Sequence, residues 1–419
     1  ATIDGLYSNR AMQGANLSQA VDEWAQGNES LLAAAGIRSA AKVKGIYRVG
    51  AQLGGPIMQD KLWFFGAVAR WGSRVNQPNA FFNTLQGTAN VPGRVTPFGY
   101  IQGPTPTLFY PGQPGTPFQN LAPGDNGATP AASFDWYRNH AGRLTWNVNS
   151  KNRVNFFADI QKSCRCTTGP FTGANSIESE RGWDWFPSGV VQGTWTAPIT
   201  SRLLLEAGGS WQVANWVNFA ESGVTRDDRS ILELATGYRY GATTLLTAPK
   251  ARTGRSAQRF TLSYVTGAHN FKGGVTLEQA FNDESADRNN SNCSISTGSQ
   301  LCDGLNYDFL NGRPAAIQYY ALPSFQQERM NAELGLFVQD QWKIKNLTLN
   351  LGIRYDYVTM GFPDATLPAG PWVPERTVKG ISGVPDWRDI NPRFGFAYDV
   401  FGNGRTAVKA SFGRYLALS

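Results

Sequence analysis

The chain contains no long hydrophobic run. Across its 419 residues the longest uninterrupted apolar stretches span about five residues, whereas a helix that crosses a membrane needs roughly 20. This absence excludes transmembrane helices. It leaves a membrane β-barrel open, because only every second residue of a barrel strand has to face lipid.

Histidine is also scarce. The chain has 2 histidines, His140 and His269, which is too few to support much acid–base chemistry or a structural zinc site. We expect His269 to be a turn residue and His140 to belong to a strand wall. The acidic run Asp283–Asp287 lacks the spacing of an EF-hand calcium loop. The sequence therefore predicts a protein that is not an enzyme and has neither a metal site nor a cofactor.

The 4 cysteines fall in two segments, Cys164 with Cys166 and Cys293 with Cys302. Neither spacing is that of a zinc-binding pair, so both favour disulfides formed in an oxidising compartment. A bond between Cys293 and Cys302 would close a short loop. A bond between Cys164 and Cys166 would be strained, and pairing across the two segments is the alternative. The sequence leaves the connectivity open.

Charge of one sign is not concentrated anywhere. There are 38 Lys and Arg against 31 Asp and Glu, a net charge of +7. The basic residues are scattered rather than grouped in runs, which argues against a nucleic-acid partner. A loosely basic surface is compatible with anionic lipid headgroups.

What the chain does have is strict alternation. From Leu347 to Tyr357, Leu, Ile and Tyr occupy every odd position, and Thr, Asn, Gly, Arg and Asp occupy every even position. This period of two predicts a strand with one apolar and one polar face. The 46 Gly and the 24 Phe, 15 Tyr and 13 Trp also suit a β-barrel with aromatic girdles.

Thirteen such strands are predicted, and twelve of them pair into hairpins with turns that mostly carry Gly, Asn or Pro. They are Thr2–Ser8, Lys44–Gly54, Lys61–Arg74, Tyr137–Asn149, Lys151–Lys162, Ser188–Ala197, Ser201–Trp216, Ser256–Thr266, His269–Phe281, Asn331–Ile344, Leu347–Met360, Pro392–Phe401 and Arg405–Tyr415.

Long polar connections alternate with these short turns. They cover residues 9–43, 75–136, 163–187, 217–255, 282–330 and 361–391. Connections of this length are uncommon in compact soluble domains, whereas outer-membrane barrels place short turns in the periplasm and long loops outside. We therefore predict one incomplete transmembrane barrel domain over residues 1–419. The first long loop is expected to hold a short helix within Asn16–Gly36, which has helical apolar spacing and ends at a glycine.

The two faces of the strands make further predictions. Trp63, Phe65 and Trp71 share a face with Ala67 and Ala69, and we expect this face to meet lipid. Polar residues on the opposite faces are candidates for lining a wet lumen. By alternation these are Glu206, Gln212, Lys272, Glu278, Glu333, Gln339, Arg354 and Asp356. Their simpler role would be to bond one another or an internal plug.

Aromatic residues in the predicted loops are candidates for contact with an external ligand. They are Trp183, Trp185, Tyr319, Tyr320 and Trp372. Packing of one loop against another is the alternative role for each of them.

Several blocks of the sequence resemble a known family. Leu334–Trp342 followed by Leu347–Asp356 resembles the barrel hairpin of TonB-dependent outer-membrane receptors. Leu53–Ile57 with Asp60–Gly66, Trp195–Gly208 and Asn391–Tyr398 resemble the Oar-like, carboxypeptidase-regulatory-like branch. The blocks occur in an order that is more specific than any one of them alone.

The resemblance implies a barrel of 22 strands around a plug, of which this chain would supply about 13. It implies location in the bacterial outer membrane, contact with outer-membrane lipid, uptake of an unidentified external substrate, and energy from the TonB complex acting through a plug that is not part of these 419 residues. The alternative function is a structural or adhesive outer-membrane barrel without active transport.

Overall fold

The computed structural model describes most of the chain. The described residues are 1–13, 42–82, 94–96, 99–101, 109–111, 130–167, 179–221, 224, 229–235, 237–244, 246–247, 251–287, 305–310, 313–322, 324–369 and 372–416. The helix predicted within 16–36, and Cys293 and Cys302, lie outside these residues. No helix in the described ranges is both long and apolar enough to cross a membrane.

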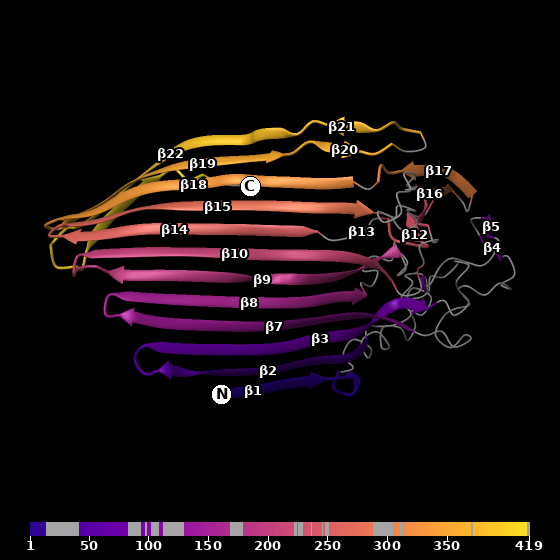
Figure 1. Ribbon diagram of the computed structural model, residues 1–419, viewed down its shortest axis with the longest axis horizontal. Coiled ribbons are helices and arrows are strands. Elements are labelled where there is room, and N and C mark those ends of the chain that lie inside the picture. The colour runs from indigo at the N-terminus through magenta and orange to yellow at the C-terminus, as the bar shows by residue number, and fades with distance from the viewer. Residues whose placement is uncertain are drawn as a thin grey trace.

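One large antiparallel sheet forms the body of the molecule (Figure 1). Along its path each strand pairs with the next long strand of the sequence, which confirms the predicted series of hairpins. The sheet is open, because β1 and β23 are its two edge strands. The path is β1 (Thr2–Ser8), β2 (Lys42–Met58), β3 (Leu62–Phe82), β7 (Pro130–Asn149), β8 (Asn152–Thr167), β9 (Arg181–Pro198), β10 (Leu203–Ala220), β14 (Arg252–Thr266), β15 (His269–Asp287), β18 (Ser324–Ile344), β19 (Leu347–Phe362), β22 (Ile381–Asp399) and β23 (Ala407–Gly413).

The two ends of the sheet differ as predicted. At one end, on the left of Figure 1, tight turns join the strands of each hairpin. Asp60 and Lys345 have positive φ in two of these turns, and Gly267, Gly402 and Gly404 have positive φ in two others, a conformation that Gly, Asn and Asp tolerate best. At the other end, on the right, the chain makes its long connections. We call these the short-turn end and the long-connection end.

The long strands extend further toward the long-connection end than predicted. For example, β3 continues to Phe82, β9 already begins at Arg181 and β15 continues to Asp287. Each predicted connection is therefore shorter than its expected range, and parts of 75–136, 163–187 and 282–330 are strand. The reason is that β-bulges interrupt the alternation close to where the predicted strands stop, for instance between Gln161 and Ser163.

Smaller sheets are built from the remaining connections. β11 (Ile231–Glu233), β12 (Tyr238–Tyr240), β16 (Leu305–Leu310) and β17 (Arg313–Tyr319) form a four-stranded sheet in the order β12-β11-β16-β17. In it β11 pairs in parallel with β16. This pairing joins the connection between β10 and β14 to the connection between β15 and β18. Further short strands are β4 (Arg94–Thr96), β5 (Gly99–Ile101), β6 (Phe109–Pro111), β13 (Leu246–Thr247), β20 (Ala365–Leu367) and β21 (Arg376–Val378), and a 3-10 turn (η1) covers Arg10–Met12.

The registers of the large sheet assign every side chain to one of two faces, because directly paired residues of neighbouring strands point the same way. On one face, Leu144 pairs with Phe156 and both are largely exposed. On the other face, Thr145 pairs with Asn155, and their side chains are hydrogen-bonded over 3.1 Å. We call these the apolar face and the polar face.

One face assignment from the sequence is wrong. Trp63 pairs with Thr145 and Ala69 with Asn139, so the row from Trp63 to Trp71 lies on the polar face and not on the apolar face. The residues between them, among them Leu62, Phe64 and Val68, lie on the apolar face. The sequence misleads here because both faces of β3 are rich in large apolar residues, and alternation alone cannot decide between them.

Candidate functional site

All eight polar residues proposed for the lumen lie on the polar face. One continuous cross-strand row runs from Glu206 through Thr261, Gly274 and Phe337 to Arg354. Each of the other predicted residues stands an even number of positions from a residue of this row on the same strand, so its side chain points to the same face. The eight residues therefore share one face across β10, β15, β18 and β19, and their part in lining a lumen stays a prediction.

Two acidic residues meet near the middle of this face. Glu278 on β15 is directly paired with Glu333 on β18, and like charges placed opposite one another across strands are destabilising. Arg255 on β14 compensates for this repulsion, because its Nε donates to Glu278 Oε2 over 2.9 Å. Arg255 was missed in the sequence because the predicted strand begins one residue later, at Ser256.

A second set of charges lies next to the first. Arg354 Nε donates to Asp356 Oδ1 over 2.7 Å, and Arg354 Nη2 donates to Thr276 Oγ1 over 3.2 Å. Asn391, almost fully buried, donates from Nδ2 to Asp356 Oδ2 over 2.7 Å. Gly335 lies between β15 and β19 and leaves room for this reach, since a Cβ there would stand 1.9 Å from Arg354 Nη2.

The other four predicted residues are placed around this charged cluster. Glu206 accepts a hydrogen bond from Thr261 Oγ1 over 3.2 Å. Gln212 is paired with Arg255. Lys272 and Gln339 are paired with each other nearer the short-turn end. The structure thus brings Glu278, Glu333, Arg354 and Asp356 together and leaves these four at the margins.

Trp183 and Trp185 are not loop residues, because both belong to β9. Their rings are stacked with centroids 5.3 Å apart, and Trp183 also contacts Trp216 of β10 at 5.0 Å. Arg181 lies over the Trp183 ring at 4.7 Å. The pairing of Trp185 with Ser163, which is itself paired with Tyr137, places the cluster on the polar face. Trp216 was not among the predicted contact residues.

A second aromatic surface lines a cavity at the β1 side of the sheet. Trp71 and Tyr137 are stacked with centroids 5.5 Å apart. The cavity has a volume of about 720 Å³, and its wall includes Arg48, Asp4 and Asn139 as well as the two rings. Arg48 and Asp4 form an ion pair of 3.5 Å. Flat rings beside charged and amide groups are suited to a ligand that has both apolar and polar surfaces.

The remaining predicted contact residues have structural partners. Tyr319 and Trp372 pack edge to face at 5.6 Å, although Trp372 is still 62% exposed. Tyr320, which directly follows β17, donates to Gln318 of that strand in the four-stranded sheet. Burial in that sheet, with the negative charge of Glu233, raises the pKa of Tyr240 to about 12.

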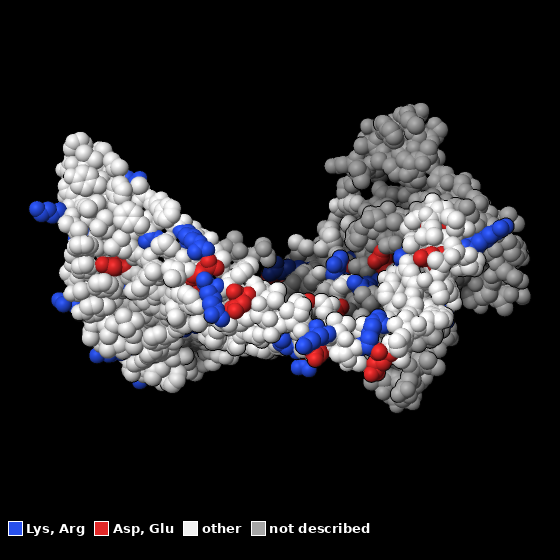
Figure 2. All heavy atoms as spheres, turned by 90° about the horizontal axis from the view of Figure 1, so that it is seen from above, with Lys and Arg blue, Asp and Glu red and all other residues white. Residues whose placement is uncertain are grey.

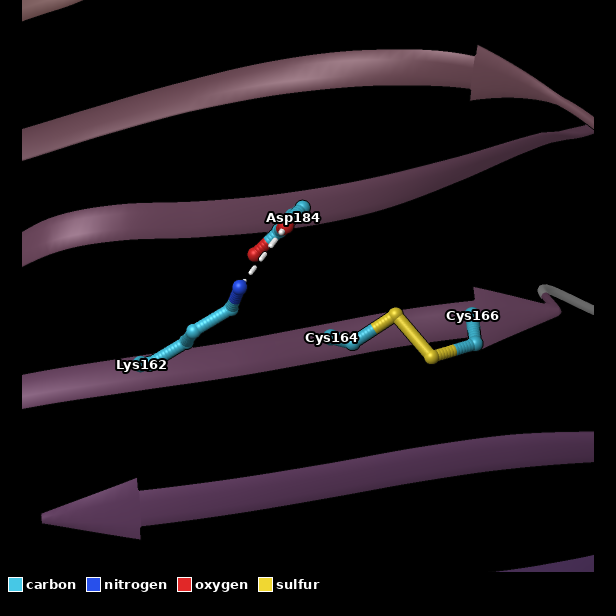
Figure 3. The surroundings of a disulfide bond; sticks show 4 residues. All are labelled: Lys162, Cys164, Cys166 and Asp184. Carbon is cyan, nitrogen blue, oxygen red and sulfur yellow. Dashed lines mark ion pairs between the residues drawn. A yellow bond between two sulfur atoms is a disulfide. The ribbon is translucent and has the colours of Figure 1, made fainter.

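A disulfide joins Cys164 and Cys166 at the long-connection end of β8 (Figure 3). Of the pairings that the sequence leaves open, the structure thus contains the one between close neighbours. Among the described residues no group of three or more His, Cys, Asp or Glu is arranged to hold a metal ion.

The geometry of the described strands is that of a wall with two chemically different faces. It is a strand sheet with an exposed apolar face and a hydrogen-bonded, ionic polar face, as expected of a barrel that separates lipid from a wet interior. Acidic and basic residues lie close together on the face of the molecule that Figure 2 shows. The ion pairs among the described residues include Arg388 with Asp386.

Comparison with known proteins agrees with this class. Residues 46–418 match the family model described as outer membrane beta barrel domain. A stretch of 205 residues is 27% identical to the TonB-dependent transporter Oar of Myxococcus xanthus and covers 46% of this chain and 17% of that protein. The crystal structure of the outer membrane transporter YddB from Escherichia coli superposes with a TM-score of 0.50 at 13% identity, over 93% of this chain and 41% of that one.

The chain belongs to the outer membrane beta-barrel domain family, and its place is the bacterial outer membrane. Within that family it is similar to the barrels of TonB-dependent transporters. It spans less than half the length of the relatives it matches.

Proposed function

We propose that this chain is part of the wall of a TonB-dependent transporter that takes up an external substrate. The apolar face meets outer-membrane lipid, and the polar face lines the lumen. The long-connection end is extracellular and the short-turn end is periplasmic, as in other bacterial outer-membrane barrels. The single observation that supports the proposal best is the continuous polar face, on which all eight predicted lumenal residues lie.

Roles for the polar face follow from its chemistry. The cluster of Arg255, Glu278, Glu333, Arg354 and Asp356 offers both signs of charge to a plug or to a passing substrate. The Trp183–Trp185–Trp216 cluster and the Trp71–Tyr137 surface lie closer to the long-connection end. They are therefore placed to contact a substrate before it reaches the charged cluster.

The test is cross-linking of the full natural polypeptide, in detergent, to the purified periplasmic domain of TonB from the same organism. The proposal predicts a specific one-to-one complex that an excess of unlabelled TonB domain prevents. If no complex forms with correctly folded protein, the transport proposal fails, and a structural or adhesive barrel becomes the better account.

A further inference from the structure

The apolar face carries a row of three cations. Arg70 of β3 is directly paired with Arg138 of β7, and Arg138 is directly paired with Lys162 of β8. Directly paired positions lie about 4.5–5.5 Å apart, a separation at which like charges repel. We call these three residues the cationic row.

The charge of the row is only partly neutralised within the described residues. Lys162 reaches across to Asp184 of β9 at 3.4 Å (Figure 3) and lies over the ring of Phe186 at 5.5 Å. Arg70 lies over the ring of Trp136 at 5.6 Å. Neither arginine has a carboxylate within ion-pair distance in the described part of the chain, and both are exposed. Three positive charges thus face one negative charge.

The cationic row stands at the border of the apolar band that is nearer the long-connection end. Trp146, on the same face of β7, lies eight residues from Arg138 toward the short-turn end. At about 3.3 Å per residue and a tilt of about 40°, this is about 20 Å along the membrane normal, close to the height of the apolar band of a barrel. The rows between them contain no Asp, Glu, Lys or Arg: Phe64–Leu144–Phe156, Gly66–Gly142–Ala158 and Val68–His140–Ile160.

Aromatic residues mark the same border. Trp136 and Tyr47 both pair with Gly72, which is two residues beyond Arg70 on β3 and lies on the same face. Trp and Tyr rings of this kind collect at the level of lipid headgroups. The cationic row therefore lies at headgroup depth, with acyl chains beside the apolar rows below it.

We propose that the cationic row binds the phosphate groups of a lipid in the external leaflet. Guanidinium groups bind phosphate through paired hydrogen bonds, and an ammonium group adds a point charge. A phosphorylated glycolipid with saturated chains, such as lipid A, has the required chemistry: anionic at the depth of the row and apolar along the band. The proposal rests on the orientation in the proposed function but not on transport.

The experiment measures binding of bisphosphoryl lipid A to the full polypeptide in an uncharged detergent, by native mass spectrometry. The double variant Arg70→Gln/Arg138→Gln should weaken binding by about tenfold for each arginine removed. The variant Arg70→Lys/Arg138→Lys keeps the charge and should give an intermediate loss. Heat-modifiable migration on a gel reports that each variant is folded.

Two matched controls test the position of the charge. Arg143→Gln removes a cation from the polar face of β7, five residues from Arg138, and should leave binding unchanged. Arg388→Gln removes a cation that already has an acidic partner, Asp386 at 3.2 Å, and should also have no effect. An equal loss in either control, or no loss in the double variant, would overturn the proposal.

The source of the phosphate is tested in the same assay. Dephosphorylated lipid A should bind no better to the natural protein than to the double variant, and inorganic phosphate should not displace bisphosphoryl lipid A. Displacement by inorganic phosphate would show an anion site without lipid specificity and would overturn the proposal. Failure of TonB cross-linking with normal lipid A binding would remove the proposed transport function alone.

Discussion

Arg354 can cross β18 to reach Thr276 because Gly335 has no side chain. We predict that Gly335→Ala displaces the guanidinium and breaks this bond. Thr276→Val should then cost about 1 kcal/mol of folding free energy in the natural protein and less in the Gly335→Ala background, where only the longer bond from Thr276 Oγ1 to the carbonyl oxygen of residue 335 (3.5 Å) is left to lose. A double-mutant cycle from urea unfolding measures the difference. Equal costs in both backgrounds would show that Arg354 keeps its bond to Thr276 despite the added methyl group.

The disulfide gives a second prediction at the scale of the residue. Peptide mapping of the unreduced protein should recover Cys164 and Cys166 linked within one peptide. The closed loop is very short, so the chain-entropy model gives only about 1–2 kcal/mol of stabilisation, and Cys164→Ser/Cys166→Ser should fold. Recovery of Cys164 linked to Cys293 or Cys302 would contradict the structure and restore the cross-segment pairing.

At the scale of the element, bulges determine where prediction from the sequence stops. Strand bounds at the short-turn end agree with the structure within a few residues, because tight turns have recognisable residues there. At the other end, bulges such as that in β9 between Trp185 and Ser188, opposite Trp216 and Ala214 of β10, reverse which face a given parity occupies on the bulged strand. The strands continue beyond the bulges, but the regular apolar and polar alternation from which they were predicted is interrupted there. Asn391 escaped prediction without a bulge, because it stands one residue before the predicted start of its strand, in a part of β22 where the register is regular.

Gly189 offers a test of how the irregular stretch of β9 is accommodated in the sheet. It follows the irregular stretch of β9, has a φ of +152°, and a Cβ there would stand 2.1 Å from the backbone oxygen of Asp159. Backbone cannot move aside as a flexible side chain can, so Gly189→Ala should destabilise the fold by about 2 kcal/mol or more. Gly193 on the same strand has no atom within 4 Å of its Cβ position, so Gly193→Ala should be neutral or slightly stabilising. Equal urea midpoints for the two variants would contradict the prediction.

At the scale of the whole molecule, the order of the strands and the asymmetry of the two ends could be predicted because each hairpin is local in sequence. The face of β3 could not, because Trp63 and Phe64 are equally apolar, and only pairing with Thr145 and Leu144 decides between them. The charged cluster was predicted in part: its acidic residues stand within clear alternation, but cross-strand partners such as Arg255 depend on register. The joining of β11 to β16 has no local sequence signal.

A spin-label accessibility scan of β3 and β7 tests most directly whether this sheet separates lipid from a polar interior. Single cysteines would be placed from Leu62 to Arg70 and from Arg138 to Trp146 in the full polypeptide in lipid bilayers, with Cys293 and Cys302 replaced by Ser. We predict high oxygen accessibility at Leu62, Phe64 and Val68, and at Leu144 and Trp146. Residues of the opposite parity on the two strands, Trp63 and Thr145 among them, should be shielded from oxygen in the bilayer. Accessibility without a period of two, or an oxygen maximum at Trp63 and Thr145, would contradict this prediction.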